Sequence, residues 1–179
     1  MTIKQLRLAS LALLVLAGTS CSSRVERTDG TVLLTVSTFS GSPGTVSVAN
    51  GPTTLTAVTL RSVNKDPSGA TGSLQDIQIR SYEVTYTRRD TGTRLPQPLV
   101  ESLFGTVAVN STAVFSNLIF LRTAQLTSPP LSDLVNFGTD QQTGSRVIPL
   151  RVTLRFFGRT LSGTDIVSDS VSFDVEVVP

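Results

Sequence analysis

Apolar and polar side chains alternate strictly in the last part of the chain. In residues 170–177, valine and phenylalanine fall on one face, and serine, aspartate and glutamate fall on the other. Residues 150–156 alternate in the same way, with leucine, valine and phenylalanine set against arginine and threonine. A period of two residues is typical of an antiparallel strand with one buried face. We therefore predict two neighbouring antiparallel strands here.

The segment RTLSGTD between these strands predicts a two-residue turn at Ser162-Gly163, which would pair Leu161 with Thr164. A slip of one residue would place apolar side chains opposite polar ones, so the pattern selects one register. That register pairs Leu150 with Val175, Arg151 with Asp174, Val152 with Phe173 and Leu154 with Val171.

Valine- and threonine-rich runs, separated by glycine, proline, asparagine and aspartate, continue through most of the chain and indicate further strands. We predict strands at 31–38, 43–50, 54–63, 75–88, 95–108, 112–122, 146–158 and 165–178.

Three local features modify this β pattern. The apolar positions of 75–88 change phase midway, which indicates either a bulge near Arg80-Ser81 or a strand covered on both faces. A second hairpin is predicted at residues 89–94. Ser128 followed by Pro129 could cap one helical turn, and an ordered loop is the alternative.

The N-terminus has a different pattern. Lys4 and Arg7 precede an apolar run at 8–18, which is shorter than the about 20 residues of a membrane-spanning helix. A basic start, a short apolar run and small residues are typical of a secretory signal peptide. The run leads through Gly18-Thr19-Ser20 to Cys21, the only cysteine of the chain.

This stretch resembles the bacterial lipoprotein signal, in which the cysteine after small residues is lipidated and becomes N-terminal. Gly18 departs from the family pattern, which usually has an aliphatic residue there. Ordinary signal cleavage, near Ala17 or Ser20, is the alternative. The resemblance implies a signal peptide at 1–20 and a lipid anchor on Cys21.

The same resemblance implies a location. Three acyl chains, each adding about 0.8 kcal/mol per buried CH₂, would hold Cys21 in the membrane. Ser22, in place of aspartate, implies the outer membrane, with the protein facing the periplasm. Residues 21–30 are then a tether, and residues 31–179 form one domain.

Charge adds little to this picture. The formal net charge of +2 comes from Lys4 and Arg7, so the chain that remains after cleavage is balanced. A balanced chain gives no support for nucleic-acid binding, and we predict no nucleic-acid partner. With Cys21 lipidated, the domain would contain no disulfide.

The strand SYEVTYTR at 81–88 and the hairpin VTLRFFGRTLSG at 152–163 resemble the small immunoglobulin-like or fibronectin type III-like domains of bacterial envelope lipoproteins. The resemblance covers residues 31–179 and lacks the cysteines and tryptophan of true immunoglobulin domains. It implies an all-β fold, an antiparallel immunoglobulin-like β-sandwich preceded by a lipoprotein signal peptide. It implies no activity.

Candidate chemistry is sparse. The chain has no histidine, which removes the commonest general base and the Ser-His nucleophile pair. A Ser–Lys pair would have to use Lys65. The string D-T-G-T at 90–93 resembles the catalytic loop of aspartic proteases, but Arg88 and Arg89 stand where that family has apolar residues. These arginines would keep Asp90 ionised, and we interpret the string as a glycine-containing turn.

Several aspartates fall in or near predicted loops, without the D-x-D-x-D-G spacing of a calcium loop: Asp66, Asp140, Asp165 and Asp169. We predict no metal, no cofactor and no catalytic residue. Residues 118–121 and Phe156-Phe157 are apolar on both strand faces, and we interpret them as covered by the second sheet and a loop, with an exposed partner patch as the alternative.

Together these patterns predict a lipid-anchored, non-catalytic accessory or protein-interaction module of the bacterial cell envelope, with an envelope protein as partner. The first alternative is a periplasmic binding protein for a lipid, glycan or metal ion, which would need a wide cavity or clustered acids. The second is a hydrolase that uses two converging carboxylates.

Overall fold

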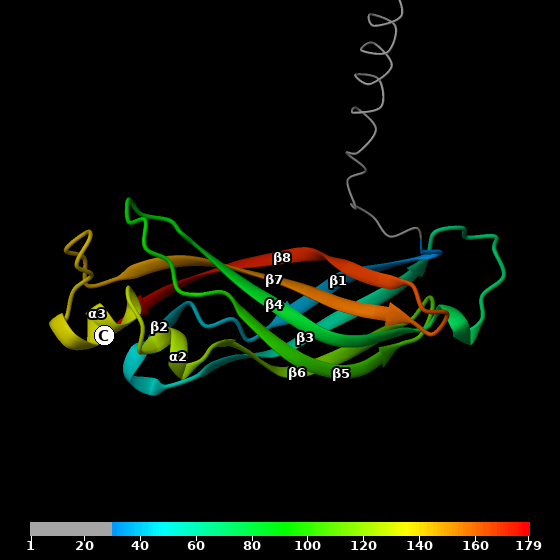
Figure 1. Ribbon diagram of the computed structural model, residues 1–179, viewed down its shortest axis with the longest axis horizontal. Coiled ribbons are helices and arrows are strands. Elements are labelled where there is room, and N and C mark those ends of the chain that lie inside the picture. The colour runs from blue at the N-terminus through cyan, green and yellow to red at the C-terminus, as the bar shows by residue number, and fades with distance from the viewer. Residues whose placement is uncertain (1–29) are drawn as a thin grey trace, which may run out of the picture.

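The structure is a computed structural model that describes residues 30–179. The signal peptide predicted at 1–20 and the lipidation site Cys21 lie outside the described residues. Among these residues eight strands are present, one within each predicted strand region, although β2 and β5 are shorter than predicted (Figure 1). They are β1 (Val32–Ser40), β2 (Thr45–Ser47), β3 (Thr53–Asn64), β4 (Ile77–Arg88), β5 (Leu99–Val107), β6 (Thr112–Leu121), β7 (Ile148–Thr160) and β8 (Asp165–Val178).

The strands form two sheets around one hydrophobic core. One sheet has the order β1-β3-β6 and the other the order β2-β8-β7-β4-β5. The buried residues of both sheets belong to a single cluster, because the apolar face of each strand points to the other sheet. The chain is therefore all-β, as predicted. All pairings are antiparallel except that of β2 with β8, which is parallel and corrects the expectation of a purely antiparallel fold.

The predicted register of β7 and β8 is confirmed, and the predicted turn is wrong. Arg151 pairs with Asp174, as predicted. At the turn, however, Thr160 donates its N–H to the carbonyl of Thr164, so the loop has three residues and Gly163 adopts a φ of 100°. A three-residue loop with glycine in this conformation is a standard hairpin connection.

A bulge further along the hairpin compensates for the extra residue in the turn. The register shifts between Arg155 and Phe157, where Ser168 and Asp169 of β8 stand opposite Phe156 alone. The hydroxyl of Ser168 accepts the N–H of Phe156 at 2.9 Å, which satisfies a backbone group that the bulge displaces. From the pair of Arg155 and Ser170 onward, away from the turn, the strands pair in the register that the alternation predicts.

The phase change in β4 is a bulge, the first of the two predicted alternatives. The register shifts between Ile79 and Ser81 in the pairings with both β5 and β7. As a result, Ile79 before the shift and Tyr82 after it both face the core.

The predicted hairpin at 89–94 is wrong in extent. The pairing of β4 with β5 ends at Val84 and Leu99, and residues 89–98 form a long connection between the two strands. Pro96 and Pro98 lack a backbone N–H and cannot continue the ladder. Residues Thr85–Arg88 pair only with β7.

Short helical turns occupy the other end of the molecule from the β7–β8 turn (Figure 1). These are α2 (Thr123–Leu126), which was not predicted, and α3 (Leu131–Phe137). Ser128 does not cap α3: its hydroxyl donates to the carbonyl of Ala124 at 2.7 Å and closes α2 instead, so α3 begins at Leu131. No helix among residues 30–179 is long and apolar enough to cross a membrane.

Two further short helical turns lie outside the predictions. The strand predicted at 43–50 ends at Ser47, whose hydroxyl accepts the N–H of Ala49 and starts the turn η1 (Val48–Asn50). The strand predicted at 75–88 begins later, at Ile77, because Ser73–Gln75 forms the turn η2 before β4.

Candidate functional site

Asp90, the aspartate of the D-T-G-T string, and Asp140 bind the same arginine, although the two aspartates are far apart in sequence. Arg88, the last residue of β4, donates from Nε and Nη2 to both carboxylate oxygens of Asp90, each at 2.6 Å. Its Nη2 also donates to Asp140 at 2.9 Å. The Arg88 and Asp140 side chains are 2% and 0% exposed, so this ion cluster is buried where the chain leaves β4.

Further hydrogen bonds stabilise the two carboxylates, although Nη1 of Arg88 and Oδ1 of Asp140 are buried without a partner among the described residues. The N–H of Gly92 donates to Asp90, in the turn that the sequence predicted. Both the N–H and the hydroxyl of Thr143 donate to the Asp140 oxygen that Arg88 contacts, at 3.0 and 2.7 Å. A buried carboxylate requires such partners, because removal of a charge from water is costly.

The electrostatics keep both carboxylates ionised. Burial alone would raise the pKa of Asp140, but the hydrogen bonds from Arg88 and Thr143 outweigh it and lower the pKa to about 2. The hydrogen bond from Arg88 also lowers the pKa of Asp90. In turn, the hydrogen bond to Asp90 raises the pKa of Arg88.

A carboxylate pair that exchanges protons needs one member with a raised pKa. Here both values are lowered by a shared guanidinium, as predicted for Asp90. The arrangement therefore favours a structural role, in which Arg88 fastens the loop after β4 to the segment before β7.

Polar contacts extend this connection along the loop. The side-chain oxygen of Gln142 accepts the N–H groups of Thr93 and Arg94, at 3.0 and 2.8 Å. Arg94 also pairs with Asp133 of α3, whose side chain is 8% exposed. The 89–98 connection is thus fixed to α3 by the ion pair of Arg94 with Asp133 and to the 139–147 segment by the hydrogen bonds of Gln142.

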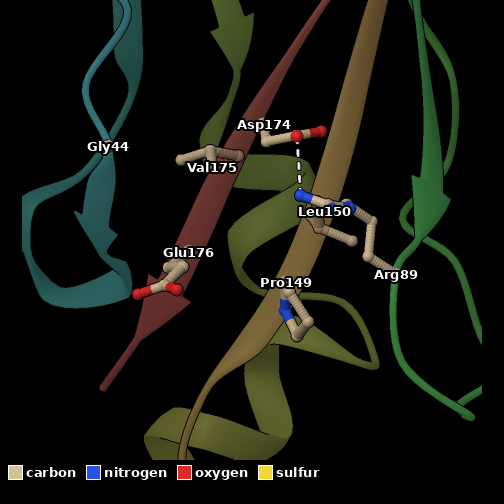
Figure 2. Close-up of a pocket in the computed structure, with 7 residues that line it drawn as sticks. All are labelled: Gly44, Arg89, Pro149, Leu150, Asp174, Val175 and Glu176. Carbon is tan, nitrogen blue, oxygen red and sulfur yellow. Dashed lines mark hydrogen bonds and ion pairs between the residues drawn. The ribbon is translucent and has the colours of Figure 1, made fainter.

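A shallow hollow lies beside this region, and Figure 2 shows its lining. Arg89 donates to Asp174 of β8 at 2.6 Å, and Arg151 approaches the same carboxylate at 3.0 Å. The volume of about 180 Å³ is below the roughly 300–1,000 Å³ of small-molecule pockets. The lining residues are Gly44, Arg89, Pro149, Leu150, Asp174, Val175 and Glu176.

The other loop aspartates of the sequence analysis lie apart and each has its own partner. Asp66 accepts the N–H and hydroxyl of Ser68 within its own turn. Asp165 pairs with Arg159 at 3.4 Å, and Asp169 accepts the N–H of Val36 in β1. Among residues 30–179, no three histidine, cysteine, aspartate or glutamate side chains gather as a metal ion would require.

The prediction of covered apolar stretches is confirmed for most of their residues, whereas Ile119 and Phe157 are half-buried. Leu118, Phe120 and Leu121 are 0–2% exposed, and Phe120 packs edge-on against Phe173 with ring centroids 5.2 Å apart. Phe156 is fully buried in the core.

Arg88 keeps Asp90 ionised, as the sequence predicted, whereas Arg89, for which the same was predicted, pairs with Asp174. The contact of Arg88 with Asp140 was not predicted. These two residues are 52 positions apart, so only the fold brings them together. No family model matches the chain, and comparisons with curated proteins and with solved structures found no match either.

Proposed function

We propose that the protein is a lipid-anchored, non-catalytic accessory or protein-interaction module of the bacterial cell envelope. The observation that carries the proposal is the position of Cys21, directly after a short apolar run and three small residues. A basic start, this run and this cysteine together match the signal of bacterial lipoproteins.

The strand order supports an immunoglobulin-like β-sandwich. By position in the chain, β1-β3-β6 corresponds to strands A-B-E of that fold, and β8-β7-β4-β5 corresponds to G-F-C-C′. Such domains act mainly through their loops and strand edges, and the fold itself implies no chemistry.

The distribution of charge supports a non-catalytic role. Asp90, Asp140 and Asp174 are each engaged by arginine, and the pKa of each is lowered by hydrogen bonds that include one from that arginine. For Asp140 these bonds act against burial, which raises the pKa. Carboxylates held in this way act as fixed charges rather than as proton donors near neutral pH.

An edge strand offers a surface for a protein partner. β5 ends the five-stranded sheet and exposes Val100 and Phe104, which are 65% and 85% accessible. Exposed apolar side chains on a strand with free backbone groups favour the addition of a partner strand.

The anchor is tested first. The full chain is expressed in a Gram-negative host as wild type, as Cys21→Ala and as the neighbouring control Ser23→Ala. We expect a wild-type N-terminal peptide that begins at Cys21 and carries diacylglyceryl and acyl mass, and a protein in the membrane fraction. Cys21→Ala should lose both properties and Ser23→Ala neither. An unmodified thiol, or cleavage at another residue, would contradict the anchor.

The interaction role is tested by photo-crosslinking in cells. A photoreactive residue at Phe104 should give a discrete protein adduct, and one at Val135 of α3, which is 60% exposed, should not. Equal adducts at both positions, or none at Phe104, would contradict a partner on the β5 edge.

A further inference from the structure

The described part of the chain begins at one end of the domain. The carbonyl of Thr31 accepts the N–H of Lys65, and its hydroxyl accepts a hydrogen bond from the side chain of Gln75. The start of β1 therefore lies against the loop 65–76. In Figure 1 this loop and the β7–β8 turn lie at the same end, opposite α2, α3 and the C-terminus.

Two exposed leucines lie at this end, one in η2 and one in the β7–β8 turn. Leu74 in η2 is 64% exposed, and Leu161 in the β7–β8 turn is 44% exposed. The two turns are joined through the backbone, since the N–H of Ser162 donates to the carbonyl of Leu74 at 2.9 Å. The N–H of Leu161 donates to the carbonyl of Asp76 at 3.0 Å, so the two turns that carry the leucines are held side by side.

The covalent chain limits how far this end lies from Cys21. Nine residues, 22–30, separate the cysteine from the domain, and full extension would span at most about 30 Å. The strand β8 has 14 residues and is about 45 Å long, at roughly 3.3 Å per residue. A lipid on Cys21 thus holds the Leu74 end close to the membrane, whereas the α3 end has no such restraint.

We propose that the lipid surface is the partner of this end, with Leu74 and Leu161 inserted into the interfacial region of the bilayer. The proposal rests on the lipid anchor of the proposed function and adds an orientation: the domain stands with η2 and the β7–β8 turn on the membrane and presents α3 away from it. Apolar side chains at the boundary of headgroups and acyl chains gain the free energy of burial that they lack in water.

The test uses the full chain, lipidated in the host and reconstituted into phosphatidylcholine–phosphatidylglycerol vesicles. Single variants Leu74→Cys, Leu161→Cys and Val135→Cys carry an environment-sensitive fluorophore. Val135 is a matched control, because it is 60% exposed and lies at the opposite end. The sulfur of a lipidated Cys21 is a thioether and does not react with the label.

We expect blue-shifted emission and several-fold stronger quenching by nitroxide-labelled lipids at Leu74→Cys and Leu161→Cys than at Val135→Cys. An independent reporter at the exposed neighbour Ala70, as Ala70→Cys, removes the concern that the label itself inserts. Its quenching should fall when Leu74→Ser and Leu161→Ser are introduced together.

The outcomes separate the orientation from the anchor. Vesicles that float with the protein but quench all three labels equally, or quench Val135→Cys most, would overturn the orientation and leave the anchor intact. A protein that does not float with the vesicles, and whose Cys21 takes up label, would overturn both. Unchanged quenching of Ala70→Cys in the double serine background would overturn the role of the leucines.

Discussion

The hydroxyl of Tyr86 in β4 donates a hydrogen bond of 2.5 Å to the carbonyl of Phe120 in β6 and joins the two sheets through the core. Tyr82, four residues earlier, makes the same kind of bond to Ile119 at 2.9 Å. The register of β6 with β3 shifts beside Phe120, which has no partner in β3, and the Tyr86 hydroxyl supplies a donor to its carbonyl. Burial raises the pKa of both hydroxyls, to about 12 for Tyr82, and both remain donors at neutral pH.

Tyr86→Phe is expected to destabilise the protein by about 1–3 kcal/mol, because it leaves a buried carbonyl without a donor. Tyr82→Phe should cost less, since its bond is longer and only partly buried. Urea unfolding of the two variants and the wild type measures both effects. Equal stability of Tyr86→Phe and wild type would show that the cross-sheet bond contributes nothing net.

Two neighbouring arginines should respond very differently to substitution. Arg88→Met leaves two carboxylates without their cation, one of them fully buried, and should destabilise by about 3–5 kcal/mol. Arg89→Met removes a pair on the surface, where the arginine side chain is 53% exposed, and should change stability only slightly. Chemical denaturation distinguishes them, and similar losses in both would refute a special role for the buried cluster.

Gly92 is required for a close approach to Arg88. A Cβ at this position would lie 2.1 Å from Cζ of the Arg88 guanidinium, which is held by Asp90 and Asp140 and cannot withdraw freely. Gly92→Ala should therefore lower the thermal midpoint by several degrees, consistent with roughly 1–3 kcal/mol of strain. Gly72→Ala is the control, because a Cβ there meets no atom within 4 Å. A midpoint for Gly92→Ala that equals that of Gly72→Ala would mean that the loop relaxes at no cost.

The strands were predictable because alternation is a local signal. Leu150 and Val152 face the core whether or not the turn is known, and a slip of one residue would expose them. The turn itself was not predictable, because an extra residue at Leu161 and a bulge at Ser168-Asp169 offset one another. Asp169 accepts the N–H of Val36 in the other sheet at 2.7 Å, so the bulge depends on tertiary structure that no local pattern encodes.

In the candidate site, too, the local contact of Arg88 was indicated by the sequence and the non-local contact was not. The sequence predicted an ionised Asp90 beside two arginines, and Arg88, two positions away, makes that contact. The contact with Asp140 depends on how the 139–147 segment folds back, which is fixed by Gln142 and by the polar contacts of Thr143. Non-local ion pairs of this kind leave no spacing signal in a single sequence.

The lowered pKa of Asp140 makes stability depend on acid in a defined window. Its value falls from an ordinary 3.8 to about 2 on folding, so the unfolded chain binds the proton more readily. The stabilisation, about 2 kcal/mol, is complete above about pH 5 and is lost as the pH falls from there towards 2. Asp140→Asn should be less stable than wild type at pH 7 and should lose less stability between pH 6 and pH 2.5. Urea midpoints at several pH values measure this difference, and parallel profiles for the two proteins would show that Asp140 is not the group whose protonation weakens the fold.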